Sequence, residues 1–171
     1  MIIADATVLI ALAKTGRLEL LRELYDEVGV GPCVRGEVVA GGKEIHAPEV
    51  AVIEAAFEAK WMRELTPNSR ERHLTRRILK GSRLHDGEAE SIALASSRRL
   101  LVLLDDKEAR LMAEATAVRY MGTAGVLLEA FFRGRLDRGG LEAAVSDLSR
   151  VIWLSPDVVA GILRRSREAP R

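Results

Sequence analysis

The sequence is poor in cysteine and in aromatic residues. Its one cysteine is Cys33, and phenylalanine, tryptophan and tyrosine together make up 4% of its 171 residues. A single cysteine excludes an internal disulfide and a zinc site built from four cysteines. The shortage of aromatic rings argues against the extended base-stacking surface of a single-strand-binding domain. Aliphatic side chains must therefore form the core.

Long apolar runs and a strong excess of one charge are also missing. No segment reaches the roughly 20 apolar residues of a membrane span, and the apolar start of the chain lacks the basic leader of a signal peptide. Because 26 Lys and Arg balance 25 Asp and Glu, any affinity for nucleic acid must come from local clusters of charge. These features predict a soluble cytoplasmic protein with a single domain.

Short apolar segments alternate with longer segments of helical periodicity, which is typical of strand and helix units around a parallel sheet. The segment LLVLL favours a central parallel strand, because such a strand is apolar on both faces. We expect four or five strands, at residues 2–4, 27–30, 61–65, 100–104 and 118–121. We expect helices at residues 9–25 with a break near Gly16, 47–60, 69–79, 87–97, 107–115, 122–133 and 155–165.

Acidic residues follow two of these strands. Asp5 ends the first strand, and Asp105 and Asp106 end the strand LLVLL. Glu37 falls about one turn into the helix after the second strand, and Glu88 falls in the first turn of the helix that leads into LLVLL. Short, right-handed connections bring such helix starts to the edge of the sheet where parallel strands end. We therefore expect the acids to meet in one pocket.

A pocket of carboxylates predicts a divalent cation. Carboxylates within a few ångströms of one another repel, and oxygen ligands select Mg²⁺ or Mn²⁺ over zinc. We expect Asp5 and Asp105 to be the inner ligands, with Glu37 and Glu88 holding a second ion or water molecules. Such a site suits hydrolysis of phosphodiesters, because substrate phosphates complete the coordination shell of Mg²⁺.

Each acid also has a structural interpretation. Asp86 is a good helix N-cap, and Glu88 is favourable in the first turn of a helix. Asp106 can cap the helix that follows it, which leaves Asp105 as the ligand. Glu90 lies about 200° round the helix from Glu88, so the two cannot face one metal equally. We place Glu88 in the pocket and Glu90 behind it.

Motifs of several other enzyme classes are missing. The histidines, His46, His73 and His85, lack the spacing of metal ligands. No GxSxG nucleophile elbow and no GxxxxGK[ST] phosphate loop occur, and GVGPCVRG has Val34 where the dinucleotide fingerprint needs its third glycine. An α/β-hydrolase, an NTPase and a NAD-dependent enzyme are therefore disfavoured.

Taken together, five segments resemble the PIN domain family, and within it the VapC-like branch of prokaryotic toxins. The segments are MIIADATVLIALAK, PCVRGEVVAGG, LHDGEAESIALA, LLVLLDDKEARLMAEA and VRYMGTAGVLLEAFFRG. The resemblance implies a three-layer α/β/α fold with a mostly parallel, four- to five-stranded sheet. It implies a single PIN-like domain at 1–171, with a core at about 1–134 and a C-terminal helical extension at about 139–171.

The resemblance also implies a metal-dependent ribonuclease whose acidic pocket binds Mg²⁺ or Mn²⁺. Its catalytic and metal-binding acids would be Asp5, Glu37, Glu88 and Asp105, with Asp106 as a further ligand. Thr7 matches a position where the family frequently has Thr or Ser, and Thr123 falls where the family often has a hydroxyl or an acid near the pocket. Glu88 is a departure, since many toxins of the branch have Asp there.

Partners follow from the same resemblance. It implies single-stranded RNA as the substrate, a homodimer, and a cognate antitoxin protein. Apolar positions near Phe131, Phe132 and Trp153 could form a dimer interface, or they could belong to the core.

A basic segment, RERHLTRRILKGSR, is a candidate for binding the RNA. Its cations are Arg70, Arg72, Arg76, Arg77, Lys80 and Arg83. Helical periodicity places Arg70, His73, Arg77 and Lys80 on one face. A solvated helix face explains the segment equally well, and so does a site for an acidic partner.

Three functions are left open by the sequence. The first is a metal-dependent single-strand ribonuclease that acts as the toxin of a toxin–antitoxin pair. The second is a non-catalytic PIN-like module that binds RNA or a protein. The third is a small-molecule phosphatase that uses the same sheet edge, since the fold alone does not fix the substrate.

Overall fold

The protein is built around one parallel sheet. The computed structural model describes residues 1–44 and 46–168. Five strands pair in the order β3-β2-β1-β4-β5, and every pair is parallel. The strands are β1 (Ile2–Ala4), β2 (Val28–Val30), β3 (Met62–Glu64), β4 (Val102–Leu103) and β5 (Tyr120–Met121). Each one lies inside a predicted segment, and the predicted number and direction of strands are confirmed.

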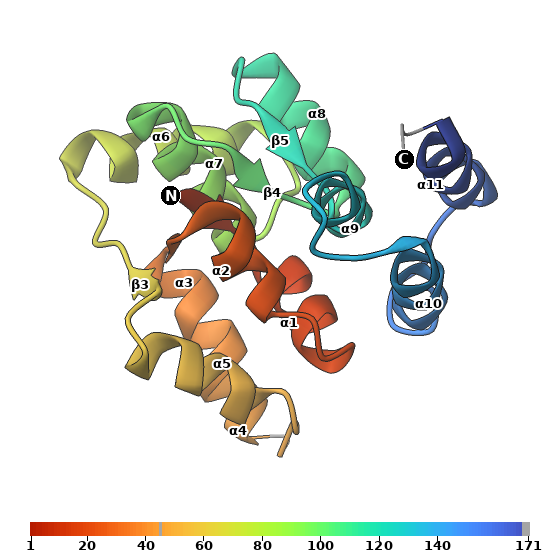
Figure 1. Cartoon of the computed structure of the whole chain (residues 1–171). Helices are drawn as coiled ribbons and strands as arrows, with labels where there is room; N and C mark the ends of the chain where they lie inside the picture. Colours follow the sequence, from red (N-terminus) through yellow and green to blue (C-terminus); the bar gives the residue numbers. More distant parts are fainter. Residues whose placement is uncertain (45, 169–171) are drawn as a thin grey trace.

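Helices cover both faces of the sheet (Figure 1). Side chains alternate along β1, so Ile2 and Ala4 pack on one face and Ile3 packs on the other. The first face is covered by α1 (Ala6–Lys14), α2 (Glu19–Tyr25), α3 (Pro32–Arg35), α5 (Val50–Glu58) and α9 (Thr123–Phe132). The second face is covered by α6 (Ser69–Gly81), α7 (Asp86–Arg98) and α8 (Lys107–Ala115). The predicted three-layer α/β/α architecture is confirmed.

Three helix starts differ from the prediction, and one of them is that of α5, which begins at Val50 rather than Ala47. The first helix begins at Ala6 rather than Leu9, because Asp5 ends β1 and takes the N-cap position itself. The N-cap of α7 is His85 rather than Asp86, which lies in the first turn. The reason is that the Glu88 carboxylate accepts the His85 N–H at 2.9 Å, which fixes the start one residue earlier.

The helix after β2 changes its winding where it carries Glu37. Following α3, a π-helical stretch η1 (Gly36–Gly41) continues into the short α4 (Gly42–Glu44). A π-helical turn is rare and locally rotates the side chains that it carries. Glu37 lies in the first turn of η1, so this winding sets the direction in which its side chain leaves the helix.

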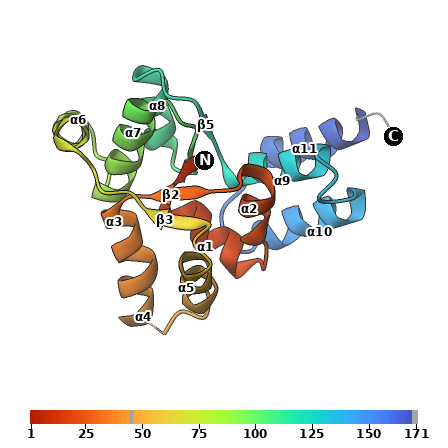
Figure 2. The same ribbon diagram turned by 60° about the vertical axis from the view of Figure 1, so that its left-hand side comes forward.

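The last helices pack beside the sheet rather than on it (Figure 2). They are α10 (Arg138–Leu148) and α11 (Pro156–Glu168). α10 buries Leu141 and Leu148 in the same core cluster as α1 and α9. Residues 169–171, the end of the predicted C-terminal extension, lie outside the described residues, and the division into core and extension stays a prediction.

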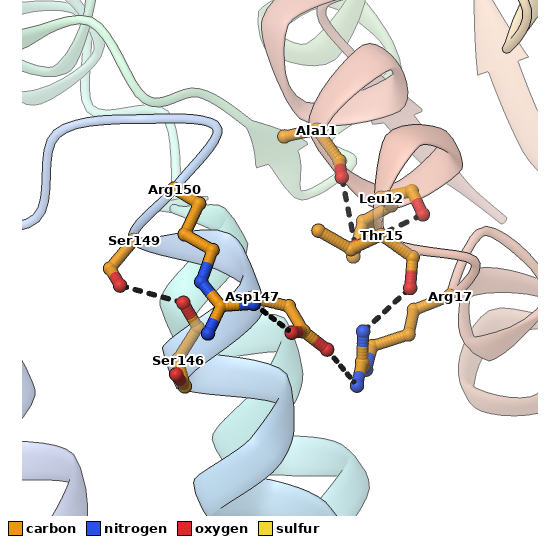
Figure 3. Close-up of polar contacts among 8 residues, drawn as sticks. All are labelled: Ala11, Leu12, Thr15, Arg17, Ser146, Asp147, Ser149 and Arg150. Carbon is orange, nitrogen blue, oxygen red and sulfur yellow. Dashed lines mark hydrogen bonds and ion pairs between the residues drawn. The ribbon is translucent and has the colours of Figure 1, made fainter.

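An ion pair fastens α10 to the turn between α1 and α2 (Figure 3). Arg17 Nη2 lies 2.8 Å from Asp147 Oδ2, and Arg17 Nη1 donates to the Thr15 carbonyl. At the other end of α10, Arg138 donates to the Ser166 carbonyl of α11 at 3.1 Å. The two C-terminal helices are therefore tied to the N-terminal part of the fold and to each other.

No helix in 1–44 or 46–168 combines the length and the apolar character that a membrane crossing requires.

Candidate active site

Acidic side chains gather at the edge where β1 and β4 end. The two strands pair in parallel, with Ala4 opposite Leu103, so that Asp5 and Asp105 leave the sheet at the same edge. Glu88 reaches this edge from the first turn of α7. Glu37 comes from η1, which follows the neighbouring strand β2.

Asp5 is the most deeply placed of these acids. The residue is 4% exposed, and its pKa is raised from 3.8 to about 7. Burial is the main cause, and the negative charges of Glu88 and Glu37 add to it. The backbone N–H groups of Ala6 and Thr7 partly offset this rise. Asp5 therefore holds its charge only weakly near neutral pH.

Gly87 leaves room between two of the carboxylates. A Cβ atom at Gly87 would lie 3.7 Å from Asp5 Oδ1 and 3.7 Å from Glu37 Oε2, and 3.3 Å from Val34 Cγ2. The carboxylates of Asp5 and Glu37 thus border a small space, and the side chain of any other residue at position 87 would partly fill it. Glu88, the next residue of α7, has its pKa raised by burial and by the charges of Asp106 and Glu37.

Asp105 lies beside this group, but its carboxylate is held by neighbours. The Thr123 N–H donates to Asp105 Oδ1 at 2.9 Å, and the Thr123 hydroxyl donates to Oδ2. Arg110 of α8 forms an ion pair with Oδ1 at 3.1 Å. Asp106 caps α8 by accepting the Ala109 N–H at 2.8 Å, as its structural interpretation predicts.

Glu90 points away from the acids and supports another element. Its Oε2 accepts the Cys33 N–H at 2.9 Å in the first turn of α3. A Cβ atom at Gly31 would lie 1.9 Å from the same oxygen, so this close approach requires glycine at that position. Glu90 therefore holds in place the helix that carries Glu37.

A pocket of about 670 Å³ opens beside the acids. Its lining includes Thr7, Glu88, Asp105 and Asp106 from the predicted site, and Lys107, Arg110 and the segment 152–155, which the prediction did not include. Within the described ranges, none of the predicted RNA-binding residues of α6 lines it. Helical spacing after Asp106 could have indicated that Lys107 and Arg110 lie near the site. No local signal indicates Trp153, because its position depends on how α10 packs against the rest of the protein.

The chemistry of the acids fits a divalent cation. In the described part of the chain, no three His, Cys, Asp or Glu side chains already converge closely enough to hold a metal ion. The carboxylates of Asp105, Asp106 and Glu88 each accept hydrogen bonds from their own neighbours. The donors are nevertheless all carboxylates, which Mg²⁺ and Mn²⁺ prefer. Burial, and after it repulsion by neighbouring acids, raises the pKa of Asp5 and Glu88.

Comparison with known proteins supports this description of the fold. A family model described as a PIN domain matches residues 1–168. Neither the curated proteins nor the solved structures contain a significant match to the sequence. PIN domains are generally nucleases, and they generally use divalent metals. Because the match spans almost the whole sequence, the chain belongs to the PIN domain family.

Proposed function

We propose that this PIN domain is a metal-dependent ribonuclease that hydrolyses phosphodiester bonds in single-stranded RNA. The observation that carries the proposal is the crowding of Asp5, Glu37 and Glu88 at the sheet edge, where Asp5 has a pKa of about 7. A buried acid such as Asp5 destabilises a fold when neighbouring carboxylates repel its charge, unless a cation lies among them. We therefore infer that these acids bind a divalent cation.

The residues that would hold the ion are Asp5, Glu37, Glu88, Asp105 and Asp106. When bound, Mg²⁺ or Mn²⁺ activates water for attack on a phosphodiester and offsets the charge that develops on the phosphate. Thr123 orients Asp105 through its N–H and hydroxyl groups. Glu90 keeps α3 and hence Glu37 in position. Arg110, which pairs with Asp105, lines the pocket and would present a positive charge to a bound phosphate.

The helix α6 gives the RNA a second contact surface. Glu71 near its start pairs with Arg98 at the end of α7, so the two helices run antiparallel. The end of α6 therefore lies beside the first turn of α7, which carries Glu88. Exposed cations on α6 attract phosphates along this route. They are Arg70, Arg72, Arg76, Arg77 and Lys80, and Arg83 follows just after the helix ends.

Cleavage of a fluorogenic single-stranded RNA tests the proposal. We expect cutting that requires Mg²⁺ or Mn²⁺, stops in EDTA, and falls at least about 100-fold in Asp5→Asn and in Glu88→Gln. Glu142→Gln, at an exposed acid of α10 outside the pocket lining, is the matched control and should cut like the parent. The proposal fails if the parent shows no metal-dependent cutting, or if Asp5→Asn cuts equally well.

The same assay separates the other two functions. Binding of RNA without cutting under every metal condition would favour a non-catalytic module. Hydrolysis of p-nitrophenyl phosphate without cutting of RNA would favour a small-molecule phosphatase.

We further propose that the enzyme is the VapC-like toxin of a toxin–antitoxin pair and acts in the cytoplasm as a homodimer. Support comes from the resemblance of its acidic motifs and from Phe132, which is 54% exposed and available to an interface. Induced expression should arrest growth for the parent and not for Asp5→Asn. Sedimentation of the parent and of Phe132→Ala tests the dimer.

A further inference from the structure

The pocket beside the acids has one wall that the proposed reaction does not use. The segment 152–155, between α10 and α11, lines this pocket together with Glu88, Asp105 and Asp106. Trp153 in this segment is 83% exposed, more than any other large apolar residue in the described part of the chain. Moving an indole ring out of water lowers the free energy. An exposed ring beside a site is therefore available to contact a ligand.

The helices on both sides of the segment 152–155 are anchored to the rest of the protein. Before it, α10 is fastened by the ion pair between Asp147 and Arg17 (Figure 3). After it, Ser155 caps α11 by accepting the Val158 N–H at 3.3 Å, and Ile162 of α11 is buried in the core cluster that contains α9. The ring is therefore carried on a short connection between two anchored helices.

Positive charges continue from this wall along α11. A second hollow, of about 390 Å³, adjoins the pocket and shares three lining residues with it. The shared residues are Ala124, Gly125 and Val158. Arg164 and Arg165 line the second hollow together with one acid, Asp157. Among the described residues, these two arginines and Lys107 of the pocket form no ion pair.

We propose that Trp153 is a stacking platform for a base of single-stranded RNA next to the phosphate that is cut, and that Arg164 and Arg165 bind phosphates further along the same strand. The proposal rests on the proposed ribonuclease function and names how its substrate is held. A base offers its flat face to an aromatic ring when it is unpaired, and arginine matches phosphate geometry. Trp153 is thus a positioning residue that selects single strands.

Charge favours RNA over a protein at this surface. An apolar peptide on Trp153 would leave Lys107, Arg164 and Arg165 without counter-ions, whereas a phosphate backbone supplies one negative charge per nucleotide. With α6 on the opposite side of the molecule from α11, the strand would have basic residues on both sides of the acids (Figures 1 and 2).

Tryptophan fluorescence tests the stacking directly, because the sequence has two tryptophans and the other, Trp61, is buried. We would use Asp5→Asn, so that RNA is not consumed, combined with Trp61→Phe, so that Trp153 alone reports. A short oligoribonucleotide titrated in Mg²⁺ buffer should quench the emission, and the same sequence in a duplex should not.

Affinity and kinetics give a second readout. In the Asp5→Asn protein, Trp153→Ala should bind the oligoribonucleotide roughly 5- to 100-fold more weakly, and Trp153→Phe should restore most of the loss. In the protein with Asp5 intact, Trp153→Ala should raise KM and leave kcat nearly unchanged. Leu111→Ala, at an exposed apolar side chain outside the pocket lining, is the matched control and should behave like the parent. Arg164→Ala with Arg165→Ala should lower the salt dependence of binding.

The proposal is overturned if RNA does not quench Trp153, or if Trp153→Ala binds RNA as the parent does. It is also overturned if Trp153→Ala changes sedimentation but not RNA binding, since the ring would then belong to a contact between copies. Cleavage by the protein with Asp5 intact is scored separately. Quenching without any cleavage would refute the proposed ribonuclease function but support the stacking site. Cleavage without quenching would support the ribonuclease function but refute the stacking site.

Discussion

Asp5 makes the stability of the fold depend on pH. Its pKa lies near 7 because the residue is buried and because Glu88 and Glu37 repel its charge. A carboxyl group with a raised pKa in the folded state keeps a proton that the unfolded chain releases. The stability that the protonated Asp5 carboxyl group contributes is therefore fully present below about pH 4. It is lost as the pH rises through about 7.

We expect Asp5→Asn to remove this dependence. Relative to the parent, the variant should gain stability between pH 4 and pH 8, by at most about 4 kcal/mol, because the amide carries no charge to bury. Urea denaturation in EDTA across this pH range measures the effect, with Glu142→Gln as the control that should follow the parent. Parallel curves for the parent and Asp5→Asn would contradict the raised pKa.

A divalent ion should stabilise the protein most at pH values at which the acids are charged. We expect Mn²⁺ to raise the melting temperature of the parent more at pH 8 than at pH 6, because protons on Asp5 and Glu88 compete with the ion. Thermal unfolding with and without Mn²⁺ checks this, and Asp5→Asn should lose most of the shift. A larger shift at pH 6 would show that the ion binds elsewhere.

At the scale of single elements, α6 depends on one buried acid. Glu71 is 1% exposed and accepts hydrogen bonds from the Asn68 N–H at 2.8 Å and from Arg98 Nε at 2.8 Å. The pairing with Arg98 is the main reason that the pKa of Glu71 is lowered. The single acid of the basic segment thus faces inward and leaves the exposed face of α6 to cations.

Glu71→Ala should therefore destabilise the protein by roughly 3 kcal/mol, since it removes the acceptor of the Asn68 N–H in the capping box and leaves the guanidinium of Arg98 without its carboxylate partner. Urea denaturation at pH 7 measures this loss. Glu71→Gln, which can still accept the Asn68 N–H, should lose less. Equal stability of Glu71→Ala and the parent would show that water replaces the ion pair at no cost.

Local sequence predicted the elements better than it predicted their side-chain contacts. All five strands and the order of acids along the chain follow from apolar runs and strand ends, because these signals lie within a few residues. The π-helical turn at Glu37 and the contact between Glu90 and Cys33 were not predicted. They depend on how α3 and α7 pack across the sheet, which no local spacing encodes.

At the scale of the whole molecule, the pair Arg17 and Asp147 couples the C-terminal helices to the rest. We expect Arg17→Ala to lower stability by about 1 kcal/mol, because the pair is partly exposed. Hydrogen exchange should speed up in α10 and in 151–155 while the sheet stays protected. Arg22→Ala, which breaks an exposed pair with Glu19, should change neither. Uniform acceleration across the chain would contradict a local role for Arg17.

The pocket wall at 152–155 also has a consequence for synthesis. A growing chain that has reached only α9 already contains every acid of the candidate site, but it lacks the segment that carries Trp153. Polypeptides emerge from the ribosome in order, and earlier parts begin to fold first. In a nascent chain, held next to ribosomal RNA, the proposed catalytic acids are therefore present before the proposed stacking residue Trp153.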